Sequence, residues 1–253
     1  MTRRFFIALQ FLTRLPVPRS LNSSETDIGK AAAFFPLVGV IVGGGAALVF
    51  VVLQRVLPLP ASVFCAIVFA SFITNGFHED GLADSFDGFG GGWTKDRVLE
   101  IMRDSRIGTY GTIILCLTFI ARAAIYETLS GVDPLVILAL LASAAAFSRS
   151  LVVDLLWATR PARSDGISVF AGRPGKRSAL FSLLTGGIGA AVAVGLALSP
   201  EIAVIAIIAA GIVLAGLRAL AMRKIGGQTG DVCGAVQVLT ELTMLTVYAA
   251  TIG

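Results

Sequence analysis

The chain has 253 residues, of which 56% are hydrophobic and only 14% are charged, and its mean hydropathy is +0.86. About a quarter of the residues of a typical soluble domain are charged, so this composition excludes an ordinary soluble fold. The net charge of +4 needs no nucleic acid to explain it, because membrane proteins concentrate basic residues in the loops on one side. The three cysteines are isolated from one another, which indicates neither a disulfide framework nor a zinc site.

The chain opens with a basic segment and a short apolar stretch, Phe5–Leu12. No small-residue cleavage site of the kind found in signal peptides follows before Pro16 and Pro18. We therefore expect the amino-terminal segment, residues 1–30, to be an interfacial segment that lies on the membrane surface.

Apolar stretches of about 20 residues then alternate with short charged ones, which is typical of transmembrane helices. The pattern predicts a single all-α domain over residues 1–253, a polytopic transmembrane helical bundle of about seven spans with short cytoplasmic helices. The second span is short and runs into a group of acidic residues, so we expect a partial or tilted helix there. The expected spans are Ala33–Leu53, Ala61–Phe77, Tyr110–Leu129, Leu135–Leu156, Ala179–Leu198, Ile202–Met222 and Gly234–Ile252.

The basic residues predict how these spans are oriented. Of the 20 lysines and arginines, only Arg55, Arg122 and Arg149 lie outside four segments that would share one side of the membrane. Because basic loops stay in the cytoplasm, we expect the amino terminus and these four segments to face it.

The densest group of acidic residues lies in Gly76–Gly92. Asp80, Asp84 and Asp87 stand at i, i+4 and i+7, so on a helix their carboxylates fall on one face and repel each other. A hard cation with oxygen ligands would offset that repulsion. The alternative is that charged residues collect in a loop only because they cannot enter lipid. His78, the only histidine, could act as a general base, or could orient other groups, since a helix places it opposite Asp80.

Two further segments of the same side carry polar residues suited to phosphate and metal. We expect a helix from about Lys95 to Arg106, capped by Thr94, and Asp104 at the membrane surface after it. Together with the acidic run, this makes residues 78–108 a candidate cytoplasmic active-site loop. The turn Gly226–Asp231 is rich in glycine, and its backbone N–H groups could contact phosphate oxygens.

Ionisable residues within the spans should face the bundle interior. Arg149 is close enough to the cytoplasmic end to serve the site, whereas Arg122 with Glu127 is expected to be structural. The role of Glu241 stays open.

Four long motifs resemble the cobalamin synthase family, the adenosylcobinamide-GDP ribazoletransferases. They are residues 78–84 (HEDGLAD) with the glycines that follow, residues 101–111 (IMRDSRIGTYG), residues 11–18 (FLTRLPVP), and residues 226–231 (GGQTGD) with Gly234, Ala235 and Glu241. The resemblance covers nearly the whole chain. It implies an integral membrane enzyme that joins adenosylcobinamide-GDP to α-ribazole or its 5′-phosphate and releases GMP, with Mg²⁺ as the cofactor.

The residue patterns and the resemblance together suggest roles for individual residues. The expected catalytic residues are His78, Glu79, Asp84 and Asp104. The expected metal ligands are Asp80, Asp84, Asp87 and Asp231. The expected substrate-binding residues are Arg106, Arg149, Arg160, Gly227 and Thr229. We expect a bacterial inner membrane protein in contact with lipid, with its site facing the cytoplasm, and leave open whether it forms a homo-oligomer.

Two other classes of protein remain as alternatives. The CDP-alcohol phosphotransferases carry D-x-x-D-G-x-x-A-R, and Asp84, Asp87 and Gly88 fit its opening, but Gly91 and Gly92 stand at the Ala-Arg positions. A cation or metabolite transporter would place its acidic residues near the middle of the membrane, whereas these cluster at one interface.

Overall fold

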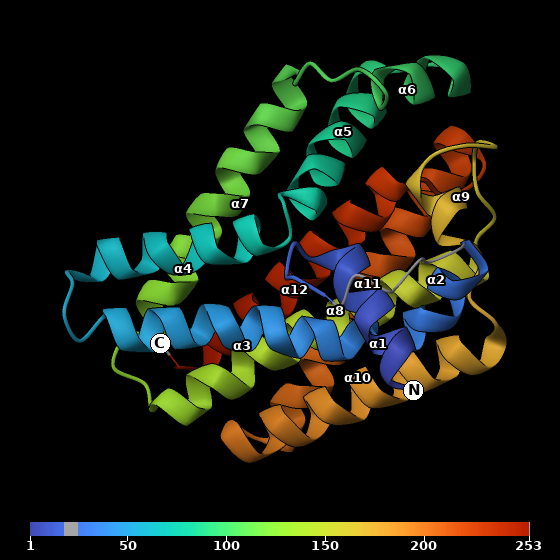
Figure 1. Ribbon diagram of the computed structural model, residues 1–253. Helices are drawn as coiled ribbons and strands as arrows, with labels where there is room; N and C mark the ends of the chain where they lie inside the picture. Colours follow the sequence, from blue (N-terminus) through green and yellow to red (C-terminus); the bar gives the residue numbers. More distant parts are fainter. Residues whose placement is uncertain (18–24, 253) are drawn as a thin grey trace.

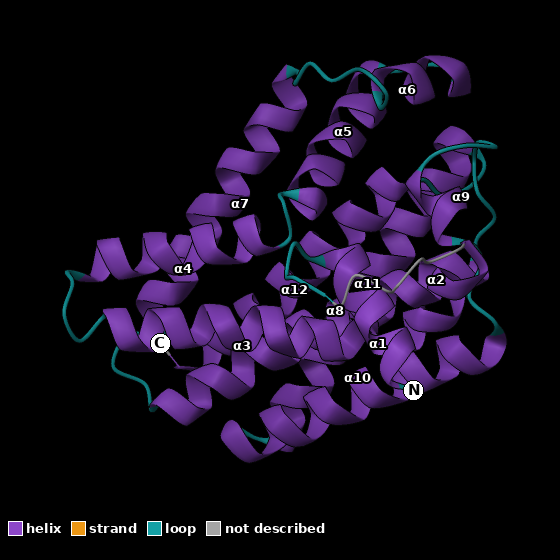
Figure 2. Cartoon of the chain, viewed as in Figure 1, coloured by secondary structure: helices purple, strands orange, loops and turns teal. Residues whose placement is uncertain are grey.

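The computed structural model describes residues 1–17 and 25–252, and every regular element in that part of the chain is a helix (Figures 1 and 2). Residues 18–24 of the expected interfacial segment, Arg19 among them, lie outside the described residues. The elements are α1 (Thr2–Leu12), α2 (Glu25–Ala31), η1 (Ala32–Phe34), α3 (Phe35–Leu53), α4 (Leu59–Ile73), α5 (Phe77–Gly91), α6 (Lys95–Ile101), α7 (Thr109–Thr128), α8 (Pro134–Ala158), α9 (Ile167–Ala171), α10 (Lys176–Ala197), α11 (Pro200–Ile225) and α12 (Gly230–Ile252).

The helical bundle confirms the predicted fold class. Within the described residues, six segments are long and apolar enough to cross a membrane: Ile28–Leu53 and helices α7, α8, α10, α11 and α12. A seventh crossing is formed only if α4 and α5 count as one broken span, because the two helices meet at an angle of 84°.

The bend between α4 and α5 explains why the second span looked short. Asn75 and Gly76 both have positive φ angles, 59° and 65°, a conformation that ends a helix. The N–H of Gly76 bonds to the carbonyl of Ser71 at 2.7 Å and closes α4. The expected partial helix is confirmed, but it ends at Ile73, and Phe77, expected in the same span, begins α5. Residues 78–108, expected as a loop, are mostly helical.

The amino-terminal helix α1 packs against other helices of the bundle. Its apolar side, which includes Ile7 and Leu12, is buried in a cluster with α3, α8 and α10. Phe11 stacks on Phe35 of α3, with ring centroids 5.8 Å apart. The expected position of this segment on the membrane surface stays a prediction.

Helix α8 lies at the centre of the bundle. In its apolar 18-residue stretch, 78% is buried inside the protein. Helix α3 lies directly against it, because Gly39 and Gly43 leave no room for a Cβ between the two backbones. The expectation that glycines within the spans serve close helix packing is confirmed here.

The two ends of the bundle differ in charge. The turns that join α3 to α4, α7 to α8 and α10 to α11 gather at one end with the carboxyl terminus (Figure 1). The amino terminus, α6, α9 and the turn before α12 gather at the opposite end. The four basic segments of the sequence belong to this second end, which we call the basic end.

Substitutions at two neighbouring glycines of α3 test the packing against α8. A Cβ at Gly43 would lie 2.7 Å from the Cβ of Ala145, whereas a Cβ at Gly44 would meet only the Cβ of Ala142, at 4.0 Å. Overpacking of this kind costs about 1–3 kcal/mol. We expect Gly43→Ala to lower the melting temperature of the protein in detergent by several degrees and Gly44→Ala to leave it unchanged. Equal effects of the two substitutions would contradict this packing.

Candidate functional site

Asp80, Asp84 and Asp87 of the expected site lie on helix α5, as their spacing predicted. Helix α5 runs beside α7 and against α12, and it points towards the basic end (Figure 1). Asp80 is exposed, Asp84 is half-buried and Asp87 is buried. We call Asp80, Asp84 and Asp231, the last from α12, the acidic face.

Two glycines bring Asp231 to this acidic face. A Cβ at Gly81 would lie 2.9 Å from the carbonyl oxygen of Asp231, and a Cβ at Gly234 would lie 2.9 Å from that of His78. The backbones of α5 and α12 therefore touch. Because of this contact, the charges of Asp80 and Asp231 both act on the carboxylate of Asp84.

Asp87 is oriented differently from its two neighbours. Its carboxylate accepts hydrogen bonds from the N–H groups of Gly108 and Gly111, at 2.7 and 2.8 Å. These groups belong to the start of α7, where N–H groups have no partner within the helix. Asp87 thus caps α7 from another helix. Its expected role as a metal ligand stays a prediction.

The segment after α6 carries Asp104 and Arg106, which bind each other. Their side chains form an ion pair at 2.6 Å, and the Arg106 backbone N–H also donates to Asp104. The Arg106 guanidinium lowers the pKa of Asp104 to about 2, so this carboxylate is ionised at every physiological pH. With Asp87, Arg97 and Tyr110 they line a cavity of about 300 Å³.

Helix α6 ends at Ile101, five residues before its expected end, so Asp104 and Arg106 follow it in an irregular segment. Thr94 caps the helix as predicted, by accepting the N–H of Arg97.

Glu79 lies on the opposite side of α5, inside the bundle. It accepts a hydrogen bond from Arg122 of α7 at 2.8 Å and one from Ser71 of α4 at 3.1 Å. The side chains of Arg122 and Glu79 are only 8% and 11% exposed. The expected pairing of Arg122 with Glu127 was wrong, because Glu79 is its close partner.

Arg149 and Glu241 complete this buried group of charges, which we call the buried ion network: Glu79, Arg122, Arg149 and Glu241. Arg149 lies 3.6 Å from Glu241 and donates to the carbonyl of Ala145, with 2% of its side chain exposed. Glu241 also accepts from Gln237 at 2.6 Å. These contacts of Arg149 lie inside the bundle, and its expected binding of substrate stays a prediction.

His78 also points away from the acidic face. Its side chain is buried, its ring meets that of Phe77 edge to face at 5.3 Å, and it lines a small apolar cavity of about 20 Å³. Of its two expected roles, orienting neighbouring groups fits this position better than accepting a proton from substrate.

The glycine-rich turn before α12 is held by the loop that follows α8. Gln228 exchanges backbone hydrogen bonds with Arg160 and Ala162 at 2.9 and 2.8 Å, and Gly227 has no room for a Cβ. Thr229 is buried and caps α12 by accepting the N–H of Val232 at 3.3 Å. Gly227 and Thr229 therefore shape the turn, and their expected contact with substrate stays a prediction. Arg160 is exposed and donates to the carbonyl of Gly226.

Arg163 is a residue of this site that the sequence did not single out. Its guanidinium lies 3.3 Å from Asp231, and its charge also acts on Asp84. It comes 68 positions before Asp231, so no periodicity could connect the two. Its only sequence signal is membership of a basic loop.

The donor atoms of the acidic face are carboxylate oxygens, the type that Mg²⁺ prefers. Among the described residues, no three His, Cys, Asp or Glu side chains converge closely enough to hold a metal ion by themselves. Mg²⁺ is usually held by one or two carboxylates together with substrate phosphates and water. The hard oxygen donors of Asp80, Asp84 and Asp231, and the repulsion among them, fit that ion.

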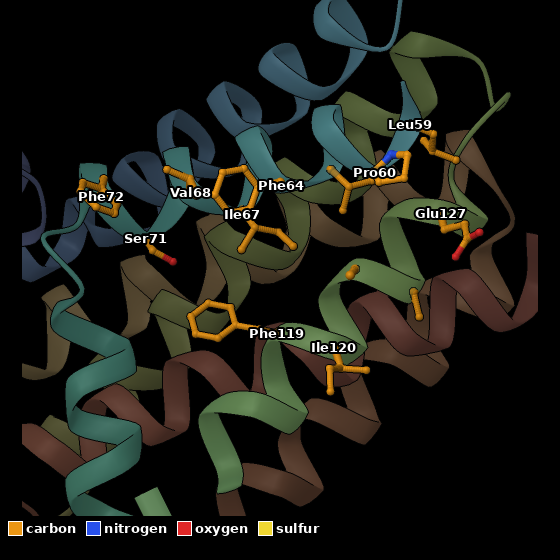
Figure 3. Close-up of a pocket in the computed structure, with 13 residues that line it drawn as sticks. Leu59, Pro60, Phe64, Ile67, Val68, Ser71, Phe72, Phe119, Ile120 and Glu127 are labelled. Atoms are coloured by element: carbon orange, nitrogen blue, oxygen red, sulfur yellow. The ribbon is translucent and has the colours of Figure 1, made fainter. Parts of the chain in front are cut away.

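A cavity of about 740 Å³ lies elsewhere, between α4 and α7 (Figure 3). Figure 3 shows Phe64 and Ile67 of α4 facing Phe119 and Ile120 of α7 across it. Its lining is almost wholly apolar, and both helices expose large apolar side chains. This cavity suits lipid chains and is separate from the acidic face.

A pair of matched substitutions tests the buried ion network. Glu79→Gln leaves Arg122 without its close partner, and breaking a buried ion pair in this way costs about 3–5 kcal/mol. Glu100→Gln breaks the exposed pair of Glu100 with Arg97, which contributes at most about 1 kcal/mol. We expect thermal unfolding in detergent to show a large loss of stability for the first and a small one for the second. A Glu79→Gln protein as stable as the wild type would contradict a structural role.

Comparison with known proteins places the chain in a family. The profile described as cobalamin-5-phosphate synthase matches residues 4–249. A relative from Ralstonia nicotianae is 37% identical over 98% of this chain and 95% of its own length. One from Bradyrhizobium diazoefficiens is 39% identical, covering 96% and 92%, and one from Shewanella baltica is 36% identical, covering 94% and 90%. All three are named adenosylcobinamide-GDP ribazoletransferase.

No solved structure gives a significant match to the chain. The family profile and the relatives nevertheless cover almost the entire length of the chain, including α5 and the turn before α12. This chain belongs to the cobalamin-5-phosphate synthase family.

Proposed function

We propose that this chain is an adenosylcobinamide-GDP ribazoletransferase. In that reaction a hydroxyl oxygen of α-ribazole, or of its 5′-phosphate, bonds to the phosphorus that carries cobinamide and gives up its proton. The bond from that phosphorus to the oxygen of GMP breaks, and GMP leaves. The shared name of relatives that align over nearly their full length supports this reaction.

The observation that carries the proposal is the acidic face with Arg163 beside it. Three carboxylates from two helices lie near one another at the basic end of the bundle, and the guanidinium of Arg163 pairs with the carboxylate of Asp231. A substrate that brings both a diphosphate and its bound cation would satisfy the carboxylates and the guanidinium together. This arrangement has no evident use in a protein that only packs against other membrane spans.

We propose Mg²⁺ as the cofactor, held by Asp80, Asp84 and Asp231. When bound, it would neutralise charge on the diphosphate and on the departing GMP. The carboxylates would hold the diphosphate through the metal, and Arg163 would bind oxygens of the diphosphate. Asp104, ionised and paired with Arg106, would hold that arginine near the site.

The basic segments at one end of the bundle support an orientation of the protein in the membrane. Because basic segments face the cytoplasm, the acidic face would open there, in a bacterial inner membrane. A cytoplasmic site suits a substrate and product that are charged nucleotides.

The buried ion network bears on the transporter alternative. Glu79 and Glu241 do lie within the bundle, as a transporter would require, but each lies beside an arginine. These paired charges need no transported ion to balance them. The match to the cobalamin-5-phosphate synthase profile also favours the transferase over a CDP-alcohol phosphotransferase.

Substitution of Asp84 tests the proposed function. Asp84→Asn keeps the shape of the side chain but removes the charge at the centre of the acidic face, so we expect turnover to fall by about 100-fold or more. The control is Asp96→Asn on the exposed side of α6, which should keep full activity. The assay measures corrinoid product and GMP by mass spectrometry, with purified protein and added Mg²⁺. Wild-type turnover by Asp84→Asn would reject the assignment.

A further inference from the structure

Arg163 reaches the acidic face from outside the two helices that form it. It lies in the loop between α8 and α9, and its Nη2 is 3.3 Å from Oδ2 of Asp231. Only 12% of the Arg163 side chain is exposed, and only 17% of Asp231. The pair is therefore part of the interior of the site.

Two of the three nitrogens of Arg163 have nothing to bind. Nε and Nη1 are both buried, and neither has a hydrogen-bond partner within residues 1–17 and 25–252. A buried donor without an acceptor costs about 1–3 kcal/mol, so such groups usually meet a ligand or water. The guanidinium thus offers unused N–H groups inside the site.

Gly166 keeps the guanidinium in this place. Its φ is +96°, a conformation that favours glycine, and a Cβ there would lie 3.1 Å from Nε and 3.2 Å from Nη2. The backbone of Gly166 therefore packs against the guanidinium with no room for a side chain.

Two arginines that the sequence predicted as phosphate ligands already have partners within the chain. Arg106 is paired with Asp104, and Nε of Arg160 donates to the carbonyl of Gly226. Arg163 is the cation whose charge acts on both Asp84 and Asp231. It partly offsets the repulsion within the acidic face.

We propose that Arg163 binds a phosphate group of the substrate, and that its guanidinium occupies Asp231 until a divalent cation takes that carboxylate. A cation on Asp231 displaces Nη2, and the guanidinium then has all of its donors available for phosphate oxygens. Arginine suits this exchange because its planar fork binds phosphate through two parallel hydrogen bonds. This inference rests on the proposed function and adds a named phosphate ligand and a coupling between cation and anion binding.

Two binding measurements on the purified full-length protein in detergent test it. Mn²⁺ binding without nucleotide is followed by the loss of the free-ion signal in electron paramagnetic resonance. Binding of radiolabelled inorganic pyrophosphate is followed by equilibrium dialysis at saturating Mn²⁺. The variants are Arg163→Gln, Arg163→Lys and, as a matched control, Arg177→Gln on the exposed side of α10.

Arg163→Gln removes the cation that competes for Asp231, so Mn²⁺ alone should bind several-fold more tightly than to the wild type. The same variant should bind pyrophosphate at least about tenfold more weakly, since a charge-assisted hydrogen-bonded pair is lost. Arg163→Lys keeps the charge without the fork and should weaken pyrophosphate binding less. Arg177→Gln should match the wild type in both measurements.

The outcomes separate this inference from the proposed function. If Arg163→Gln binds pyrophosphate as the wild type does, or if Arg163→Lys fails to recover any binding in a folded protein, Arg163 is not the phosphate ligand. If Mn²⁺ binds the wild type but Arg163→Gln does not tighten that binding, the exchange on Asp231 is wrong while the metal site stands. If the wild type binds Mn²⁺ only together with pyrophosphate, the exchange is rejected and the metal site stands; if it binds Mn²⁺ under neither condition, both are rejected.

Discussion

The contact between α5 and α12 at Gly81 and Gly234 is the constraint on which the site depends. Because neither residue has a side chain, the two backbones touch, and Asp231 comes to lie beside Asp80 and Asp84. A larger residue at either position would separate the helices and with them the carboxylates. Glycine here serves close approach of two helices rather than the flexibility of a turn.

The two sides of α5 differ in how their charges are balanced. Towards the bundle, Glu79 and Glu241 are balanced by Arg122 and Arg149, which is the usual condition for charges within a membrane protein. On the acidic face, Arg163 pairs with Asp231, and its charge also acts on Asp84. The ion pair of Glu79 with Arg122 holds one side of α5 against the bundle. Asp80 and Asp84 then lie on the other side of the helix. Paired charges and mutually repelling charges thus occupy opposite sides of one helix.

Much of this could be predicted from the sequence, because it depends on local patterns. The spans follow from apolar length, and the acidic face follows from the spacing of Asp80 and Asp84 along a helix. The pairings across the bundle could not be predicted, since they join residues far apart in the chain. Asp87 caps a helix that begins 22 residues later, and Arg163 pairs with Asp231. The burial of Arg149, Thr229 and Glu79 was not predicted either, because depth in the bundle is not visible in a motif.

The most direct test of the central claim is to locate the metal. A structure of the protein in lipid, determined with Mn²⁺ and inorganic pyrophosphate, would show the ion from its anomalous scattering or its density. We predict a single cluster of metal density in direct contact with carboxylate oxygens of Asp84 and Asp231, one helix on each side of the ion. Metal bound at another place in the chain, with α5 and α12 still in contact at Gly81 and Gly234, would contradict the account.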